Sequence, residues 1–244
     1  MTGKKIKIAL CLSGEPRSSM ASFPYIYETF LTDNNRYETE VYIHSLKGFR
    51  ALNMYEPKNS LIENLNITQL QISLNKSLLN ESKKFNNSHN PTLTMHSNTL
   101  TNQFLMFRSI YNCFKLIEEP YDIYIRARYD MIFKSKFPFI HILEEILENK
   151  YDMFIPYQFP NKKITNEYND QFAIGNYSSM SIYSNILKYI PKLIDQTDNF
   201  NSQIWIKNWL DKNNIKVHQA YIDWRLIRQC NIITNDELFN FLDE

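Results

Sequence analysis

Glycine is scarce in this sequence, with only 4 residues among 244. The motifs GxGxxG and GxxxxGKS/T are both missing, which excludes a dinucleotide-binding Rossmann fingerprint and a P-loop. GxSxG and HExxH are missing too, so the sequence contains neither a hydrolase nucleophile elbow nor a zinc-protease helix. Two of the few glycines, Gly14 and Gly175, end expected strands, where a positive φ or a close approach to a ligand requires glycine. For Gly14, a plain turn and a ligand-binding loop are both open.

Cysteine and net charge are also low. The three cysteines, Cys11, Cys113 and Cys230, are far apart and have no CxxC spacing. Because Cys11 and Cys113 lie in apolar runs, we expect buried thiols and a reducing, cytoplasmic location. The net charge of +1 indicates neither a nucleic-acid partner nor an anionic membrane. No run of about 18 apolar residues occurs, and the first residues lack the apolar core of a signal peptide, so we expect no transmembrane span.

The patterns that are present alternate between strands and helices. Residues 6–12 form a near-continuous apolar run, as in a strand buried on both faces of a parallel sheet. A turn at 13–17, a helix at about 22–31 and a strand at 40–44 complete a right-handed βαβ unit. Further strands are expected at 121–133, 151–155, 170–175 and 215–219, helices at 101–118, 141–149, 178–187 and 203–210, and an amphipathic segment at 223–230. The sequence therefore predicts an α/β fold with a mixed, mostly parallel central sheet flanked by helices.

Residues 47–100 are the part of the chain that these patterns assign least well. A third strand is expected at 67–74, and residues 75–98 are polar. A loop this long is usually functional or disordered, so the region is interpreted either as a lid or acceptor loop or as an inserted segment. The chain shows no repeat and no linker, and the simplest organisation is a single domain over residues 1–244.

The strand expected at residues 121–133 combines an apolar start with a charged end. If the extended conformation persists, Tyr124, Arg126, Arg128 and Asp130 share one side of it. One explanation is a salt bridge between arginine and aspartate that closes the strand end. The other is a crevice in which the arginines face phosphate oxygens and Asp130 faces a divalent metal. We favour the crevice, because open α/β sheets bind ligands outside the carboxyl ends of their strands.

Two other expected strands carry polar residues at their ends. Ser13 and Arg17, beside Gly14, offer a hydroxyl and a guanidinium to a phosphate or a nucleoside. Asp170 precedes a short strand, where it is either an ordinary turn residue or a general base that holds a substrate hydroxyl.

Two histidines also end expected strands. His44 ends the second strand and is expected to line the same crevice. His218 ends a late strand, where it is either a structural histidine or a ligand of a metal held by Asp130.

Four short motifs occur in a fixed order along the chain. They are Ser13-Gly-x-Pro-Arg17, His44-Ser45, Arg126-x-Arg-x-Asp130 and Asn169-Asp-Gln-Phe-x-Ile-Gly175. In this order the sequence resembles a group of GT-A-type glycosyltransferases found in large DNA viruses and in bacterial polysaccharide or lipopolysaccharide gene clusters. The resemblance spans most of the chain except residues 47–100.

The resemblance implies a Rossmann-like GT-A fold and a set of residue roles. Ser13, Gly14 and Arg17 would contact the nucleotide, residues 126–130 the diphosphate, and Asp170 the acceptor hydroxyl. In GT-A enzymes a metal-binding Asp-x-Asp usually stands at the matching place, and the metal (Mn²⁺ or Mg²⁺) bridges the diphosphate. Here only its last aspartate is kept, because the segment reads Arg-Tyr-Asp at residues 128–130. Metal dependence is therefore open, since Arg128 can itself neutralise diphosphate charge.

The function implied by the resemblance is a nucleotide-sugar-dependent hexosyl- or deoxyhexosyltransferase. It would move a sugar to a hydroxyl of a glycan or lipid-linked acceptor, in the host cytoplasm if the chain is viral. An inverting enzyme needs a base, for which Asp170 is the candidate, whereas a retaining enzyme does not. The alternatives are a nucleotidyltransferase on a related fold and a non-catalytic glycan-binding domain.

Overall fold

The computed structural model describes residues 5–14, 19–32, 36–45, 59–62, 93–133, 137–157, 167–190 and 201–226, and their side chains except those of 19–21, 59–62 and 93–101. Cys11 and Cys113 are buried free thiols, as expected. The predictions of a strand at 67–74 and of a nucleotide contact at Arg17 lie outside the described residues. In the described part of the chain, no helix has the length and hydropathy needed to cross a membrane.

Within the described residues, seven strands form one sheet in the order β3-β2-β1-β4-β7-β6-β8. Their bounds are β1 Ile6–Gly14, β2 Tyr37–Ser45, β3 Asn59–Ile62, β4 Ile123–Ala127, β6 Met153–Phe154, β7 Phe172–Gly175 and β8 Val217–His218. Strands β3, β2, β1 and β4 are parallel, β7 is antiparallel to both of its neighbours, and β6 is parallel to β8. The predicted fold class is confirmed: α/β, with a mixed and mostly parallel central sheet.

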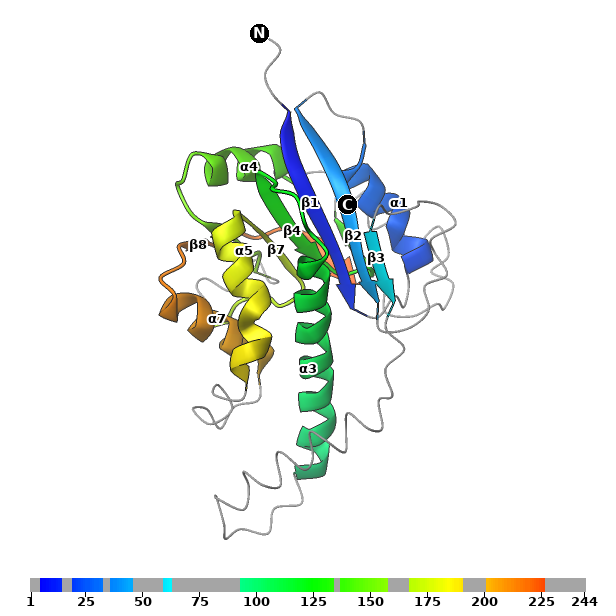
Figure 1. Ribbon diagram of the computed structural model, residues 1–244, viewed down its shortest axis with the longest axis vertical. Helices are drawn as coiled ribbons and strands as arrows, with labels where there is room; N and C mark the ends of the chain where they lie inside the picture. Colours follow the sequence, from blue (N-terminus) through cyan, green and yellow to red (C-terminus); the bar gives the residue numbers. More distant parts are fainter. Residues whose placement is uncertain are drawn as a thin grey trace.

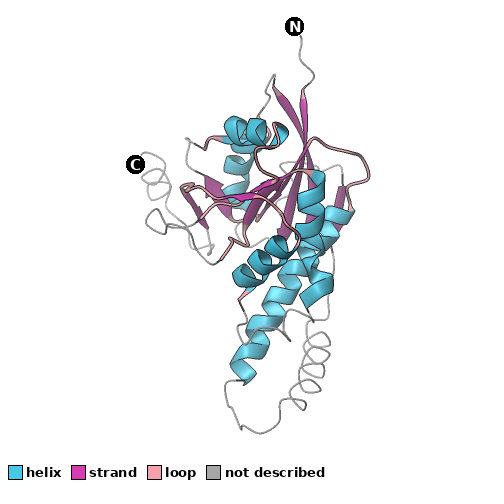
Figure 2. Cartoon of the chain, turned by 90° about the vertical axis from the view of Figure 1, so that its left-hand side faces the viewer, coloured by secondary structure: helices cyan, strands magenta, loops and turns pink. Residues whose placement is uncertain are grey.

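Helices cover both faces of this sheet, as Figures 1 and 2 show from two directions. Helices α1 (Ser19–Phe30) and α4 (Phe139–Leu147) pack on the core that contains Leu10 and Leu12 of β1. The opposite core contains Ala9 and Cys11, together with side chains of four helical elements. These are α3 (Leu93–Lys115), α5 (Tyr177–Ser184), the 3-10 helix η2 (Asn185–Tyr189) and α7 (Ser202–Lys212). Because successive side chains of a strand point to opposite faces, β1 contributes to both cores in turn.

The expected strand at residues 121–133 is interrupted, which corrects the prediction of one extended segment. Strand β4 ends at Ala127, a turn follows, and β5 (Met131–Phe133) then pairs with β9 (Trp224–Leu226) in a separate two-stranded sheet. Tyr129 in the turn is 1% exposed, and its hydroxyl donates a hydrogen bond to the carbonyl oxygen of His44 at 2.8 Å. The turn is therefore anchored to the neighbouring strand β2, and the charged residues on either side of Tyr129 are held at the end of the sheet.

Helix α3 begins at Leu93 rather than at the predicted Thr101, and it ends at Lys115, before Pro120. The predicted start of this helix at residue 101 is therefore wrong. The apolar stripe used for the prediction marks only the part of the helix that packs on the sheet, where Phe107 and Ile110 are buried. Backbone hydrogen bonds extend the helix further towards its amino terminus without such a stripe.

Candidate active site

The carboxyl ends of strands β1 and β4 and the beginning of strand β7 lie at one edge of the sheet. Leu12 pairs with Ala127, so Gly14 lies just beyond the end of β4, and Gly14 has a φ of +121°. Strand β7 is antiparallel to β4 and pairs Phe172 with Ala127, so the residues that precede β7 reach the same edge. Strand β2 pairs Ser45 with Gly14, so the structure brings described parts of all four sequence motifs to this edge. This is the place where open α/β sheets bind ligands.

The side chain of Arg126 is buried at this edge of the sheet, and part of its guanidinium group has no hydrogen-bond partner among the described residues. The residue is 1% exposed, on the face of the sheet covered by α3 and α5. Its Nε and Nη1 atoms have no hydrogen-bond partner among the described residues. Burial lowers the pKa of Arg126, and the nearby groups of Tyr183, Asp170 and Asp130 act in the opposite direction. A buried charge without hydrogen bonds is costly, so this guanidinium is suited to an anionic ligand.

Three other buried polar groups near this edge also lack partners among the described residues. They are the hydroxyls of Ser13 and Tyr183 and the Oε1 atom of Gln171. Tyr183 interacts electrostatically with both Arg126 and Asp170, and burial raises the pKa of its phenol to about 12. Ser13 comes one residue before the end of β1, and Gln171 comes one residue before β7. Buried polar groups are normally hydrogen-bonded, so a group of unpaired ones at one place indicates a ligand site.

Arg128 and Asp130 form a bidentate ion pair across the turn. Nε of Arg128 donates to Oδ1 of Asp130 and Nη2 donates to Oδ2, each at 2.7 Å. The side chain of Asp130 is 1% exposed and that of Arg128 is 24% exposed. The salt-bridge explanation of these residues is therefore confirmed. The pair nevertheless stands beside Gly14 and Arg126 at the end of the sheet and is not an exposed surface pair.

Asp170 is half-buried and belongs to the same cluster. The hydroxyl of Ser202, the first residue of α7, donates to Oδ2 of Asp170 at 2.6 Å. The other carboxylate oxygen has no hydrogen bond among the described residues. The electrostatic influence of Asp170 on Arg126 and Tyr183 places it close to both. One oxygen of Asp170 is thus held in place and the other is available to a substrate hydroxyl.

His44 is fully buried, and both of its ring nitrogens bind helix α3. Nδ1 lies 2.8 Å from Oγ of Ser109, and Nε2 lies 3.3 Å from Nδ2 of Asn112. Its side chain therefore joins β2 to α3. With both ring nitrogens in contact with α3, the donor-binding role of His44 stays a prediction.

His218 lies in β8, three strands away from β4, and its ring stacks on Tyr151 with centroids 4.8 Å apart. The register across β6 and β7 aligns His218 with Ile125, and three strand spacings amount to about 14 Å. The structure does not bring His218 to Asp130.

The described side chains offer few ligands for a metal ion. They contain no group of three or more His, Cys, Asp or Glu residues that could hold a metal ion. Both oxygens of Asp130 already accept hydrogen bonds from Arg128. The described donor set therefore does not fit a metal as it stands.

Gln171, Tyr183 and Ser202 are the site residues that were not assigned a role from the sequence. Gln171 stands inside the motif before β7, which was a signal that could have been used. Tyr183 and Ser202 reach the site only through the packing of α5 and α7. No local pattern marks them.

No protein-family model and no curated protein matches this sequence. Similar solved structures include mouse xyloside xylosyltransferase 1, which is 11% identical, with 88% of this chain and 84% of that chain covered and a TM-score of 0.44. Another is Francisella tularensis 2-C-methyl-D-erythritol 4-phosphate cytidylyltransferase, at 10% identity, coverages of 97% and 98% and a TM-score of 0.47. A third is 4-diphosphocytidyl-2C-methyl-D-erythritol synthase from Anaerococcus prevotii, at 10% identity, coverages of 98% and 95% and a TM-score of 0.46. Similarities at these TM-scores and identities carry no argument about function.

Proposed function

We propose that this protein is a glycosyltransferase that moves a hexosyl or deoxyhexosyl group from a nucleoside-diphosphate sugar to a hydroxyl of a glycan or lipid-linked acceptor. The observation that carries the proposal is the buried guanidinium of Arg126, with Nε and Nη1 unpartnered among the described residues, at the carboxyl end of the parallel strands. A diphosphate could supply the missing acceptors, because its several oxygens can accept separate, charge-assisted hydrogen bonds from Nε and Nη1, which point in different directions.

Two features favour a diphosphate over a simpler anion. Arg128 is close enough to Arg126 to lower its pKa, so two cations from one strand end lie near each other. A ligand with two neighbouring negative groups relieves this repulsion better than a single carboxylate does. Gly14 has a positive φ and, among the described residues, no atom lies within 4 Å of the position that a Cβ would occupy, which favours a close approach of its backbone to a nucleotide.

The transfer would proceed by attack of the acceptor oxygen on the anomeric carbon of the donor. The new carbon–oxygen bond forms as the bond from the anomeric carbon to the β-phosphate oxygen breaks, and the electron pair leaves with the nucleoside diphosphate. Negative charge then develops on phosphate oxygens, where a preorganised cation in a buried site is most effective. We assign this role to Arg126, supported by Arg128.

For an inverting transfer, the acceptor proton must pass to a base on the face opposite the leaving group. Asp170 is the candidate, because its Oδ2 is fixed by Ser202 and its Oδ1 has no hydrogen bond among the described residues. For a retaining transfer, the same carboxylate would hold the acceptor hydroxyl, and the hydroxyl proton would pass to the departing β-phosphate oxygen.

Binding of Mn²⁺ or Mg²⁺ stays a proposal. An ion at Asp130 would have to displace Arg128 from both carboxylate oxygens. A divalent ion would neutralise phosphate charge when bound. In the proposed reaction the arginines carry that charge neutralisation.

The test is calorimetric titration of the protein with UDP-, GDP- and dTDP-sugars, with and without Mn²⁺. We expect one nucleotide-sugar to bind to the wild type, no detectable binding to Arg126→Met, and wild-type binding to Arg36→Met. Arg36 is a matched control because it pairs with Glu144 on the surface, with its side chain 60% exposed. Asp170→Asn is expected to keep donor binding and to lose turnover with an acceptor.

Two results would oppose the proposal in different ways. If no nucleotide-sugar binds with or without Mn²⁺, the chain is not a transferase of this kind, and the non-catalytic alternative is favoured. If the protein releases pyrophosphate from a nucleoside triphosphate and a sugar phosphate, it is a nucleotidyltransferase, which would use the same cations.

A further inference from the structure

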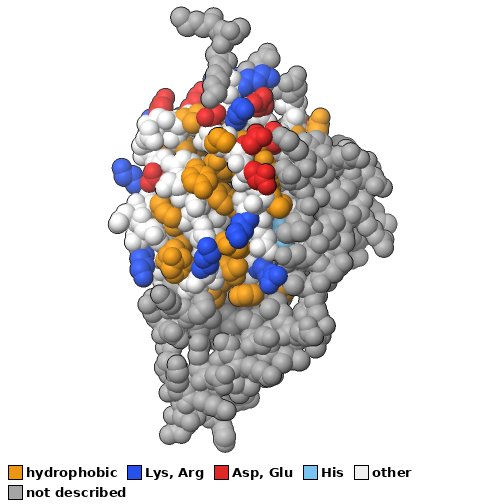
Figure 3. All heavy atoms as spheres, in the orientation of Figure 1, with side chains coloured by type: hydrophobic (Ala, Val, Ile, Leu, Met, Phe, Trp, Pro, Cys, Tyr) orange, Lys and Arg blue, Asp and Glu red, His pale blue; other side chains and the backbone are white. Residues whose placement is uncertain are grey.

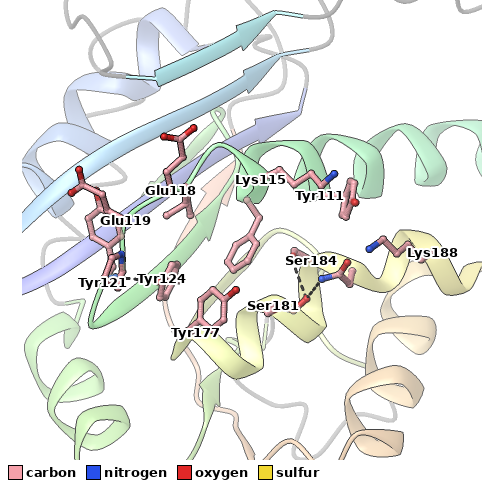
Figure 4. Close-up of a pocket in the computed structure, with 14 residues that line it drawn as sticks. Tyr111, Lys115, Glu118, Glu119, Tyr121, Tyr124, Tyr177, Ser181, Ser184 and Lys188 are labelled. Atoms are coloured by element: carbon pink, nitrogen blue, oxygen red, sulfur yellow. Dashed lines mark hydrogen bonds between the residues drawn. The ribbon is translucent and has the colours of Figure 1, made fainter.

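A cavity lies at the amino-terminal end of β4, away from the strand ends that form the candidate active site. It has a volume of about 730 Å³, within the range of small-molecule sites. Its walls come from α3 and the segment that follows it, from the start of β4, and from α5 and η2 (Figure 4). Tyr124 lines this cavity, and Arg126 lies two residues further along the same strand.

Two lysines from different helices face one aromatic ring in this cavity. Nζ of Lys115 lies 4.9 Å from the ring centroid of Tyr111, and Nζ of Lys188 lies 5.1 Å from it. Figure 4 shows both ammonium groups reaching Tyr111. Hydrogen bonding from Lys115 is the main reason that the pKa of Tyr111 is lowered. Within the described residues neither lysine makes an ion pair, so two cations converge without a counter-charge.

The rest of the cavity offers aromatic faces and unused polar groups. Tyr177 is 61% exposed, and its ring centroid lies 5.6 Å from that of Tyr124 and 6.0 Å from that of Phe114. The hydroxyl of Ser181 and Oδ1 of Asn185 make no hydrogen bond among the described residues. A flat ring beside hydroxyl and amide groups suits a ligand that has one apolar face and several hydroxyls.

Charge is divided between the two ends of the cavity. Glu118 and Glu119 stand at the end away from Lys115 and Lys188 (Figure 4). The face of the molecule shown in Figure 3 carries side chains of both signs of charge among the described residues. A ligand with negative charge along its whole length, such as a nucleic-acid strand, would be repelled by the glutamates. A ligand with one anionic group and neutral hydroxyls fits both ends, because carboxylates accept hydrogen bonds from hydroxyls.

We propose that this cavity binds an acidic saccharide, with the carboxylate or phosphate of one sugar between Lys115 and Lys188 and a sugar ring against Tyr177. The site is independent of nucleotide-sugar binding at the other end of β4. It does not rest on the proposed transferase activity.

The test is calorimetric titration with three probes: a disaccharide of glucuronate and N-acetylglucosamine, the same disaccharide with its carboxyl group reduced to an alcohol, and inorganic phosphate. We expect the acidic disaccharide to bind, and reduction of its carboxyl group to weaken binding about 10-fold, as for loss of a hydrogen bond to a charged group. Lys188→Gln should weaken binding of the acidic form by a similar factor and leave the neutral form unaffected. Tyr177→Ala should weaken both forms. Lys212→Gln, which changes an exposed lysine of α7 outside the cavity, should weaken neither.

The proposal is overturned if the acidic and neutral disaccharides bind equally, if Lys188→Gln and Lys212→Gln behave alike, or if inorganic phosphate binds as tightly as the disaccharide. Thermal unfolding of each variant confirms that it is folded, which is expected because these side chains are exposed. Failure here is distinguishable from failure of the proposed transferase. The probes contain no nucleotide, and Lys188→Gln should bind nucleotide-sugars as the wild type does.

Discussion

Replacement of Arg126 by methionine should stabilise the ligand-free protein and abolish its response to a nucleotide-sugar. The guanidinium is buried, and Nε and Nη1 have no hydrogen-bond partner among the described residues, so the folded state carries the desolvation cost of a charge without full compensation. Replacing a whole buried ion pair by apolar side chains of similar volume is often neutral or stabilising by about 1–4 kcal/mol. Arg126 makes no ion pair among the described residues, so its removal leaves no paired charge behind. Asp170 and Asp130 attract Arg126 and offset part of this gain.

The expected net effect of Arg126→Met is therefore a gain of about 1–3 kcal/mol in the free energy of unfolding. For a chain of this length, each kcal/mol corresponds to a rise of roughly 2–4 °C in Tm. Urea denaturation measures the free energy, and thermal unfolding gives Tm. A saturating ligand adds stability to the wild type, about 2.7 kcal/mol at 100 times Kd, and should add none to Arg126→Met.

Arg36→Met is the control, because an exposed ion pair of this kind contributes about 0–1 kcal/mol. The reasoning is refuted if Arg126→Met lowers the stability of the ligand-free protein by more than about 1 kcal/mol. Arg126 would then be a structural partner of the carboxylates, and the cost of its burial would be met within the protein. If Arg126→Met is more stable than the wild type and no longer responds to the ligand, Arg126 is a residue retained for binding at the expense of stability.

Three further changes test other parts of the structure. Asp130→Asn breaks the buried ion pair with Arg128 and should lower the free energy of unfolding by about 3 kcal/mol. This value is at the lower end of the range for buried pairs, because Arg128 is partly exposed. A decrease of less than about 1 kcal/mol in urea denaturation would contradict this. Gly175→Ala places a Cβ 2.5 Å from Oγ of Ser179, so it should lower Tm. Adding Ser179→Ala should restore part of the lost Tm. If the double variant shows no recovery, the clash lies elsewhere. Tyr183→Phe removes a buried hydroxyl that has no partner among the described residues, so it should be neutral or stabilising at pH 7. Burial raises the pKa of Tyr183 to about 12, whereas the pKa in the unfolded chain is near 10. The wild type should therefore lose stability as the pH rises from 10 to 12, and Tyr183→Phe should lose less. If the free energy of unfolding falls equally steeply with pH in both proteins, this reasoning is wrong.

The order of elements follows from local patterns that can be read along the chain. The apolar run before Gly14 and the alternation before Ser45 predict two strands, and both are present as β1 and β2 in parallel register. Burial on both faces of a parallel strand requires a continuous apolar run, which is why such strands are visible in a single sequence. Helix α3 shows the limit of this approach, because it begins at Leu93, eight residues before the start that the apolar stripe indicates.

The candidate site was partly accessible in the same way. Residues at strand ends stand out because charged and glycine residues interrupt apolar runs, and this marked Gly14, Arg126 and Asp170. The structure confirms that their strands meet at one edge, since β7 turns back antiparallel beside β4. It also places His218 three strands away, although its position at a strand end looked equivalent in the sequence.

The residue types and their spacing along the chain determined which segments become strands and helices, and which strands end in charged residues. Those properties depend on neighbours within a few residues, through side-chain alternation and backbone hydrogen bonding. Packing between distant segments settled the rest: that Tyr183 and Ser202 join the site, and that Lys188 meets Lys115 over Tyr111. Each of these contacts depends on the order and direction of strands in the sheet and on where the helices lie across it, and no local pattern encodes that arrangement.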